Sequence, residues 1–232
     1  MKNISVLLFL LITLALNAQN NKTSGLNARQ FHKYWKVESE SPDYKVTFLG
    51  DTVEILSPKG LTLWRKEKMS GKVTIEYDAC VVVEVEGDRL SDLNCFWMAS
   101  DPQYPDNIWK REKWRSGIFL NCYSLQLYYM GYGGNHNSTT RFRRYDGNEA
   151  AITNAKARPA ILKEYTDADH LLEANKWYHI KITNENNRVS YYINGVRLVD
   201  FRDAAPLTEG WFGFRTTLSR TCLLYTSDAA DE

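Results

Sequence analysis

An alternation of apolar and polar residues with a period of two dominates the chain. In the run 73–86, VTIEYDACVVVEVE, apolar residues occupy every odd position from Val73 to Val85, and most even positions are polar. A helix would place apolar residues three and four apart, so this run predicts a β-strand. Gly87 and Asp88 follow and predict the end of the strand.

Shorter runs of the same kind, separated by turn residues, predict further strands and no long helix. Pro58-Lys59-Gly60 predicts a turn, Asn194-Gly195 predicts a type I′ hairpin turn, and a helical turn is expected at 167–172. The expected strands are 44–49, 53–56, 61–64, 94–99, 117–122, 177–183, 189–193, 196–201 and 210–216. We therefore expect an all-β protein, a single antiparallel β-sandwich.

The beginning of the chain resembles a secretory signal peptide. Lys2 supplies a positive start, residues 6–16 are apolar but too few to span a bilayer, and Ala18 ends a stretch typical of a cleavage site. We expect residues 1–18 to be removed, residues 19–30 to be a flexible N-terminus, and the mature protein to be secreted or periplasmic. No later apolar run is long enough to cross a membrane, so no membrane contact is expected after cleavage.

The end of the chain, CLLYTSDAADE, matches the translation of a common sequencing adapter codon for codon. We therefore expect residues 222–232 to be an artefact and residues 31–221 to form the β-sandwich domain. On this hypothesis the last strand of the domain is missing, and its absence leaves an unpaired sheet edge.

Composition narrows the possible partners. Without residues 1–18 and 222–232, the chain has 28 basic and 25 acidic residues, which is too small an excess to predict nucleic-acid binding. Cys80, Cys95 and Cys122 lack the spacing of a metal site, so they predict either one disulfide or buried thiols. Aromatic residues make up 13% of the chain, and flat aromatic rings are the platforms on which sugars bind.

Candidate binding chemistry concentrates in the stretch 123–147, YSLQLYYMGYGGNHNSTTRFRRYDG. It begins as a strand with aromatics on both faces, passes through three glycines, and ends in an arginine-rich strand. On that strand Arg141, Arg143 and Tyr145 project to one side, and a cationic and aromatic surface of this kind suits an anionic sugar. The alternative is a solvated edge strand whose charges prevent aggregation.

Two further loops carry candidate residues. We expect Trp109 and Trp114 in the charged loop 101–114, together with Trp97 on the preceding strand, to offer aromatic rings to a polysaccharide. Asp101, Asp106 and Asn107 are oxygen donors that suit a structural calcium ion, although water alone could solvate them. No other cofactor and no catalytic metal are expected.

The segments WYHIKITNENNRVSYYINGVRLVDF and GWFGFRT resemble the closing strands of the concanavalin A-like jelly-roll superfamily. With FWMASDP and YYMGYGGNHNSTTRFRRYDG, they make the chain similar to the bacterial domain of unknown function 6250 family. The resemblance implies a jelly roll and a place among proteins of plant polysaccharide breakdown. It also implies a last strand after Arg220.

Two kinds of catalysis fit the residue types. Glucanases of this fold carry carboxylates at alternate positions of one strand, and Glu84, Glu86 and Asp88 are the nearest match. Cleavage of a uronate polymer by β-elimination needs a base and a group that neutralises the carboxylate. We assign the catalytic role to His136, Tyr128, Arg141 and Tyr145, and substrate binding to Asn135, Arg143, Tyr132, Trp97, Trp109 and Trp114.

The sequence thus predicts a carbohydrate-active protein that acts on an acidic, uronate-containing polysaccharide or oligosaccharide, as a lyase or glycosidase. A non-catalytic carbohydrate-binding module and a structural accessory protein remain open. A groove with a convergent base would indicate an enzyme, and a flat row of exposed aromatics would indicate a binding module.

Overall fold

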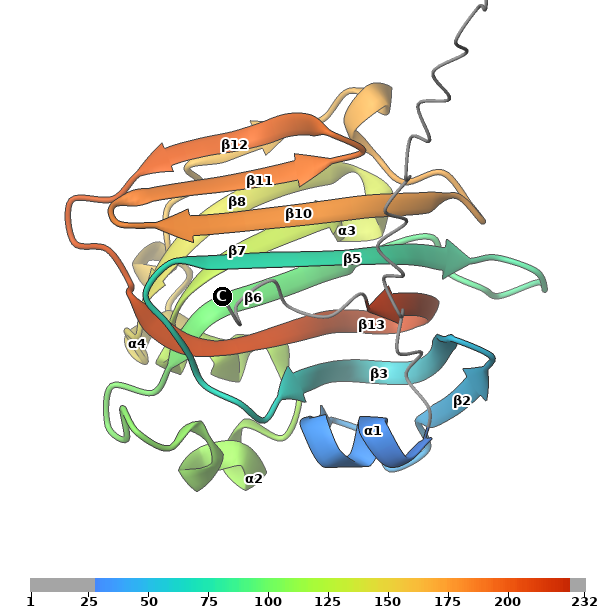
Figure 1. Ribbon diagram of the computed structural model, residues 1–232, viewed down its shortest axis with the longest axis horizontal. Coiled ribbons are helices and arrows are strands. Elements are labelled where there is room, and N and C mark those ends of the chain that lie inside the picture. The colour runs from blue at the N-terminus through green and yellow to red at the C-terminus, as the bar shows by residue number, and fades with distance from the viewer. Residues whose placement is uncertain (1–27, 226–232) are drawn as a thin grey trace, which may run out of the picture.

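Antiparallel strands in two facing layers make up the chain in a computed structural model that describes residues 28–225 (Figure 1). The strands are β1 (Trp35–Ser39), β2 (Lys45–Leu49), β3 (Thr52–Arg65), β4 (Met69–Ser70), β5 (Val73–Val82), β6 (Leu93–Ser100), β7 (Gln126–Gly133), β8 (Thr139–Asp146), β9 (Lys163–Tyr165), β10 (Trp177–Glu185), β11 (Arg188–Ile193), β12 (Val196–Arg202) and β13 (Glu209–Tyr225). The expected all-β antiparallel sandwich is confirmed.

Helices within the described residues are short. They are α1 (Ala28–Tyr34), η1 (Ile108–Arg111), α2 (Glu112–Arg115), η2 (Phe119–Ser124), α3 (Gly134–Asn137), α4 (Ala150–Thr153), η3 (Ala155–Ala157) and η4 (Ala168–His170). In this part of the chain no helix is long and apolar enough to span a lipid bilayer. The proposed signal segment 1–18, residues 19–27 and residues 226–232 lie outside the described residues.

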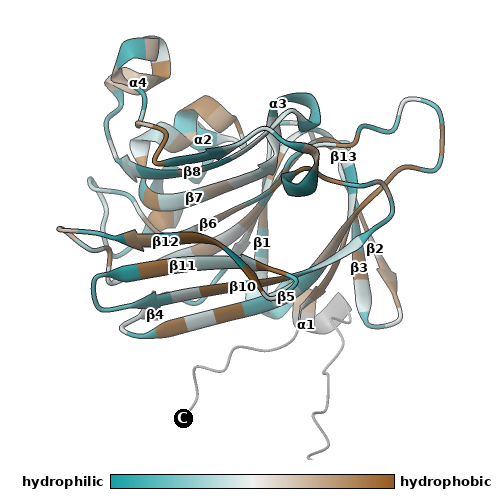
Figure 2. Cartoon of the chain, turned by 90° about the horizontal axis from the view of Figure 1, so that it is seen from above, coloured by the Kyte–Doolittle hydropathy of each residue, from teal (hydrophilic) through white to brown (hydrophobic). Residues whose placement is uncertain are grey.

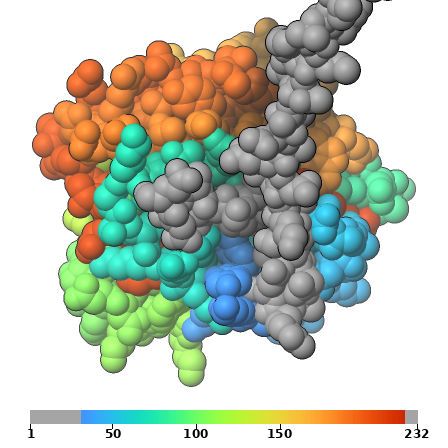
Figure 3. All heavy atoms as spheres, in the orientation of Figure 1, coloured from blue at the N-terminus to red at the C-terminus, as the bar shows by residue number. Residues whose placement is uncertain are grey.

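The strand order β12-β11-β10-β5-β13-β6-β7-β8-β9 runs through both layers. The strands β12, β11, β10 and β5 form one layer, whose outer face is shown in Figure 3, and β6 to β9 form the other. The long strand β13 joins them, because residues 211–215 pair with β6 and residues 220–225 pair with β5. The strand β3 follows β13 along its length and therefore also belongs to both layers.

The prediction of a turn at Pro58-Lys59-Gly60 is wrong, because β3 continues through these residues. They lie where the register of β3 on β13 shifts between Thr217 and Ser219, so Pro58 sits at an irregularity that needs no amide donor. A side chain at Gly60 would overlap the guanidinium of Arg215 and would lie 2.6 Å from the carbonyl oxygen of Gly117. The segment therefore bends a strand from one layer to the other.

The end of β13 differs from the prediction that the domain stops near Thr221. Residues 220–223 pair with both β3 and β5, residues 224–225 pair with β5, and Leu223 is 2% exposed within the core. Cys222 and Leu223 are apolar and continue the alternation of the strand, so they fill the slot that would otherwise be an unpaired edge. The origin of residues 222–232 in an adapter stays a prediction.

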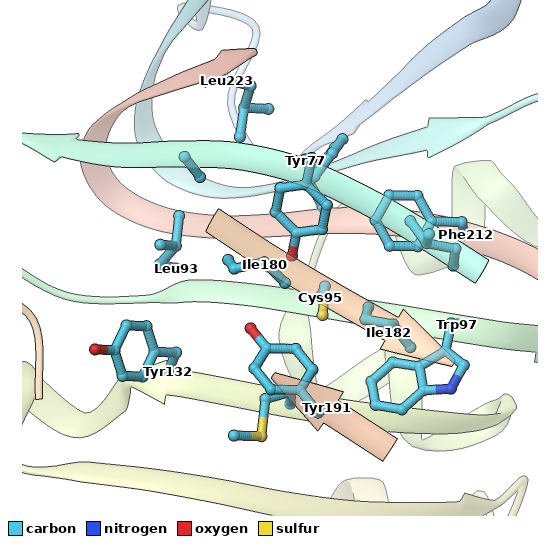
Figure 4. Packing of buried hydrophobic residues seen from close by; sticks show 14 of the residues in the cluster. Tyr77, Leu93, Cys95, Trp97, Tyr132, Ile180, Ile182, Tyr191, Phe212 and Leu223 are labelled. Atoms are coloured by element: carbon cyan, nitrogen blue, oxygen red, sulfur yellow. The ribbon is translucent and has the colours of Figure 1, made fainter. Parts of the chain in front are cut away.

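The main core lies between the two layers. The odd residues of β5 from Val73 to Val81 face it, as the alternation predicts, but the strand ends at Val82 and not at Glu86. Figure 4 shows Tyr77, Cys95, Tyr191 and other core residues that meet there from both layers. Cys80, Cys95 and Cys122 are buried free thiols, and burial raises the pKa of Cys122 to about 11 and that of Cys95 to about 12.

A second apolar cluster covers part of the outer face of β6, β7 and β8. Phe96, Leu127 and Tyr145 face outward and are covered by Cys122, Tyr123 and Leu125 from the segment before β7 and by Ala151 of α4. The expected strand at 117–122 is therefore wrong, because residues 119–124 form the 3₁₀ helix η2. The apolar residues of that run pack down onto a sheet and do not extend it.

We expect Leu223→Ala to lower the free energy of unfolding by about 2–4 kcal/mol, since it leaves a cavity in the core between the layers. Denaturant unfolding followed by tryptophan fluorescence measures the change. Val196→Ala, at a side chain that is 62% exposed, is the control and should change it by less than about 0.5 kcal/mol. An unchanged midpoint for Leu223→Ala would show that residues 222–225 do not pack as described.

Candidate functional site: an arginine-lined groove

A groove of about 530 Å³ lies on the outer face of the layer that contains β6, β7 and β8. Figure 2 shows this layer with α3 at its edge, on the side away from β5 and β10. The strands β7 and β8 supply the floor, η2 and the segment after η3 supply one wall, and α3 closes one end. The segment before β6 and residues 217–218 of β13 complete the lining.

The register of the strands places the floor residues in rows. The polar row consists of direct cross-strand partners from β13 to β9, namely Arg215, Asn94, Gly131, Arg141 and Glu164. The neighbouring aromatic row consists of Gly213, Phe96, Tyr129 and Arg143. The helix η2 covers much of the aromatic row, so the groove follows the polar row and the end of the aromatic row at Tyr129 and Arg143.

A buried arginine supports the wall of the groove. Arg215 is 2% exposed, and its Nη1 donates hydrogen bonds to the carbonyl oxygen of Gly117 (2.5 Å) and to Thr62 Oγ1 (3.3 Å). Its guanidinium carbon lies 5.6 Å from the ring centre of Phe119, which lines the groove and packs on Tyr129. The wall is therefore anchored to the sheet beneath it.

A strained turn presents His136 at the end of the groove. Asn135, His136 and Asn137 have φ values of 52°, 58° and 56°, a left-handed conformation that costs free energy in residues with a Cβ atom. The side chain of Asn137 holds the turn, because its Nδ2 donates to the carbonyl oxygen of Leu172 (2.9 Å) and its Oδ1 accepts from the Leu172 amide (2.8 Å). The exposed side chains of Asn135 and His136 line the groove.

Positive charge is in excess in the groove. Its lining contains four arginines and one carboxylate, Asp92, which pairs with Arg89 at 2.8 Å. Arg141 pairs with Glu164 at 2.5 Å. Arg143 donates to the carbonyl oxygen of Pro159, and Arg158 lies 5.7 Å from the ring centre of Tyr123.

Neither Arg143 nor Arg158 has a carboxylate partner among the described residues. The groove therefore divides into a half with neutralised arginines, near Arg89 and Arg141, and a half with uncompensated arginines, near Arg143 and Arg158.

The tyrosines of the floor are poor bases. Burial raises the pKa of Tyr129 well above its ordinary value, and the carboxylate of Asp92 adds to the effect, whereas Arg215 and Arg143 lower it less. Burial raises the pKa of Tyr145 in the same way. Both phenols therefore keep their protons, and of the bases predicted from the sequence His136 is the one that remains in the groove.

The groove does not fit a two-carboxylate glycosidase. Such enzymes need two carboxyl groups on either side of the scissile bond, and among the described residues that line the groove Asp92 is the only carboxylate. Glu84, Glu86 and Asp88 follow the end of β5, and Asp88 Oδ2 accepts hydrogen bonds from the amides of Glu84 and Val85 in a turn. The strand arrangement of the glucanase carboxylates is absent at these positions.

A family model described as "Domain of unknown function (DUF6250)" matches residues 55–224. The chain belongs to the DUF6250 family. The match extends into the segment that we expected to lie outside the domain. A search of curated proteins found no match.

Solved structures similar to this DUF6250 chain share its jelly-roll fold at low identity. A protein of unknown function with a galectin-like fold from Bacillus subtilis has a TM-score of 0.66 and 14% identity, over 86% of this chain and 90% of that one. Carbohydrate binding module CBM66 from Bacillus subtilis has a TM-score of 0.54 and 17% identity, over 84% of this chain and 94% of that one. Endo-β-1,3-glucanase from Pyrococcus furiosus has a TM-score of 0.54 and 10% identity, over 88% of this chain and 89% of that one. The expected concanavalin A-like jelly roll is confirmed.

Of the predicted site residues, the structure brings Asn135, His136, Arg141, Arg143 and Tyr145 of the DUF6250 chain together in the groove. The common side of Arg141, Arg143 and Tyr145 follows from the alternation of β8, as the sequence predicts. Tyr145 is fully buried at the floor, and its hydroxyl has no hydrogen-bond partner within residues 28–225.

Three predicted residues face the opposite way. Tyr128, Tyr132 and Trp97 belong to the core between the layers, because β6 and β7 are covered on both faces. The hydroxyl of Tyr128 donates to Asp203 Oδ2 (2.7 Å), and that of Tyr132 donates to the carbonyl oxygen of Leu171 (3.2 Å). These three side chains are buried and lie outside the groove lining, so the groove gives no support to the catalytic or binding roles predicted for them.

The two loop tryptophans lie outside the groove lining. The ring of Trp109 packs edge-on against Trp211, and the guanidinium of Arg111 lies 4.1 Å from the ring centre of Trp114, which is 43% exposed. They therefore do not form a row with Trp97.

The oxygen donors considered for calcium serve other partners. Asp101 is buried beside Arg111 and Arg115, Asp106 lies 3.4 Å from Lys68, and Asn107 caps η1 by accepting from the Trp109 amide. Within residues 28–225, no group of three or more His, Cys, Asp and Glu side chains could hold a metal ion.

Seven groove residues outside the stretch 123–147 were not predicted from the sequence: Arg89, Asp92, Asn94, Phe119, Arg158, Thr217 and Leu218. They come from segments that are distant along the chain and that carried no pattern beyond turn or strand residues. The adjacency of Asn94 to Gly131 depends on the pairing of β6 with β7, which sequence alone does not specify.

We expect Asn137→Ala to destabilise the DUF6250 domain by about 1–3 kcal/mol, since it removes both hydrogen bonds to Leu172 and leaves an alanine at φ 56°. Asn137→Gly loses the same bonds but tolerates the left-handed conformation, so it should destabilise less. Urea unfolding of the two variants and the unmodified protein tests this order. Equal stability of all three proteins would contradict the stabilising role assigned to the hydrogen bonds between Asn137 and Leu172.

Proposed function

We propose that this protein binds an acidic, uronate-containing polysaccharide in the groove, as a carbohydrate-recognition domain. The observation that supports the proposal is the pair of arginines without a carboxylate partner, Arg143 and Arg158, beside an aromatic floor. Arginine binds carboxylates through two parallel hydrogen bonds, and aromatic rings contact the apolar faces of sugars. The groove volume of about 530 Å³ also lies within the range of small-ligand sites, about 300–1,000 Å³.

The fold is consistent with this proposal. Similar folds occur in a carbohydrate binding module and in an endo-β-1,3-glucanase, although at identities that carry no inference about ligand. The signal-like residues 1–18 support a secreted or periplasmic location, where such polymers are met.

Elimination of the bound uronate is the second candidate function. It is favoured by His136, which is exposed in the groove and lies on a strained turn. The raised pKa values of Tyr129 and Tyr145 argue against a tyrosine base, so a lyase here would depend on His136. The lone groove carboxylate argues against a glycosidase.

The test is affinity electrophoresis and calorimetry with polygalacturonate, against a neutral β-glucan of similar length. We expect Arg143→Ala and Arg158→Ala each to weaken polygalacturonate binding about ten- to a hundredfold, since each loses a charge-assisted interaction of about 1.5–3 kcal/mol. Arg197→Ala, on β12 in the other layer, is the matched control and should bind like the unmodified protein. Raising the salt concentration should weaken binding.

Equal retention of the neutral glucan, or unchanged binding by both groove variants, would contradict the proposal. Absorbance near 235 nm, followed during the same incubations, separates the two functions. A rise that is lost in His136→Ala would establish elimination, and a flat trace with retained binding would establish a recognition domain.

A further inference from the structure

Asn94 offers a buried hydrogen-bond acceptor to the groove. Its side chain faces outward from β6 and is 5% exposed, and its Nδ2 donates to Asp92 Oδ1 (3.2 Å). Since an ionised carboxylate only accepts hydrogen bonds, this contact assigns the amide orientation and leaves Oδ1 as the free atom. No donor within residues 28–225 reaches Oδ1, and a buried acceptor without a donor is costly.

The position of Asp92 is itself well determined. Arg89 Nη1 lies 2.8 Å from Asp92 Oδ2, and the hydroxyl of Ser91 donates to the same oxygen (3.0 Å). The amide of Asp92 donates to the carbonyl oxygen of Gly133. Asn94, which lines the groove, is thus held by a fixed carboxylate.

The neighbour of Asn94 on β7 is Gly131, which has no side chain. A Cβ atom at Gly131 would overlap the hydroxyl of Tyr129 and would lie 2.8 Å from its Cζ atom. The tip of the Tyr129 ring therefore lies over the Gly131 backbone, beside Asn94 and in front of Arg141. This arrangement combines an apolar surface with an unused acceptor, which is what a sugar ring with a free hydroxyl requires.

Charge separates this place from the uncompensated half of the groove. Arg89 and Arg141 are neutralised by Asp92 and Glu164, so a ligand carboxylate gains little here and meets the acceptors of Asp92 and Asn94. Arg143 lies two strands from Asn94 and one side-chain position further along, about 12 Å away between Cα atoms for standard strand spacing. One sugar ring cannot span both places.

We propose that the groove recognises a neutral sugar residue directly beside a uronate residue: the neutral residue lies against the ring of Tyr129 and donates a hydroxyl hydrogen bond to Asn94 Oδ1, while Arg143 and Arg158 bind the carboxylate of its neighbour. This inference rests on the proposed function and adds the ligand class, an acidic saccharide with alternating neutral and carboxylated residues. A homopolymer of uronates places a carboxylated residue in both halves and therefore binds less tightly.

Calorimetry with two tetrasaccharides tests the inference on the full chain. One is tetragalacturonate, and the other alternates galacturonate with neutral rhamnose. We expect the unmodified protein to bind the alternating tetrasaccharide at least about fivefold more tightly. In Asn94→Ala the ratio of the two affinities should fall to about one, mainly because binding of the alternating ligand weakens.

Two controls separate recognition from folding. Asn184→Ala also removes a buried amide whose Oδ1 has no partner among the described residues, but Asn184 lies on β10 and should leave the ratio unchanged. Gly131→Ala displaces Tyr129 and should also lower the ratio. The ratio compares the affinities of one protein for two ligands, so a general loss of stability does not lower it.

The outcomes separate this inference from the proposed function. Equal affinity of the unmodified protein for both tetrasaccharides overturns the inference and leaves acidic-saccharide binding intact. A preference that survives Asn94→Ala overturns the role of Asn94 and with it the inference. Failure to bind either ligand overturns the proposed function and the inference together.

Discussion

The pairing of β3 with β13 is the constraint on which the rest of the structure depends. Each of these long strands contributes to both layers, so their shared bend determines how the layers face one another. The bend requires a glycine at position 60, where the guanidinium of Arg215 and the carbonyl oxygen of Gly117 approach the backbone. Through Arg215, the same bend anchors the wall that carries Phe119.

The groove exists because the outer face of one layer is only partly covered. The helices η2 and α4 bury most of the aromatic row, whereas covering the rest of the polar row would also bury the charged side chains of Arg141 and Glu164. Gly131 and the left-handed turn at 135–137 then shape the floor and one end. Strain in this turn is offset by the Asn137 contacts to Leu172, so its presence at the groove is consistent with a functional role for His136.

Electrostatics decides between the chemistries that the residue types allow. Burial keeps the floor tyrosines protonated, and the lone groove carboxylate is paired with Arg89, so neither a tyrosine base nor a carboxylate pair fits. Uncompensated arginines instead favour attraction of an anionic ligand. Recognition of an acidic saccharide needs only these features, and elimination would need His136 in addition.

The strand faces follow from the local amino-acid pattern, because a period of two assigns each residue to one side of a sheet once the strand exists. The outward placement of Arg141, Arg143 and Tyr145 and the buried face of β5 both follow from this rule. Which face is open to solvent depends instead on the packing of the whole domain: Tyr128, Tyr132 and Trp97 point into the core, since both faces of their strands are covered. The pairing of Asn94 with Gly131 and the passage of β3 through Pro58 likewise depend on contacts between distant segments, which local pattern does not encode.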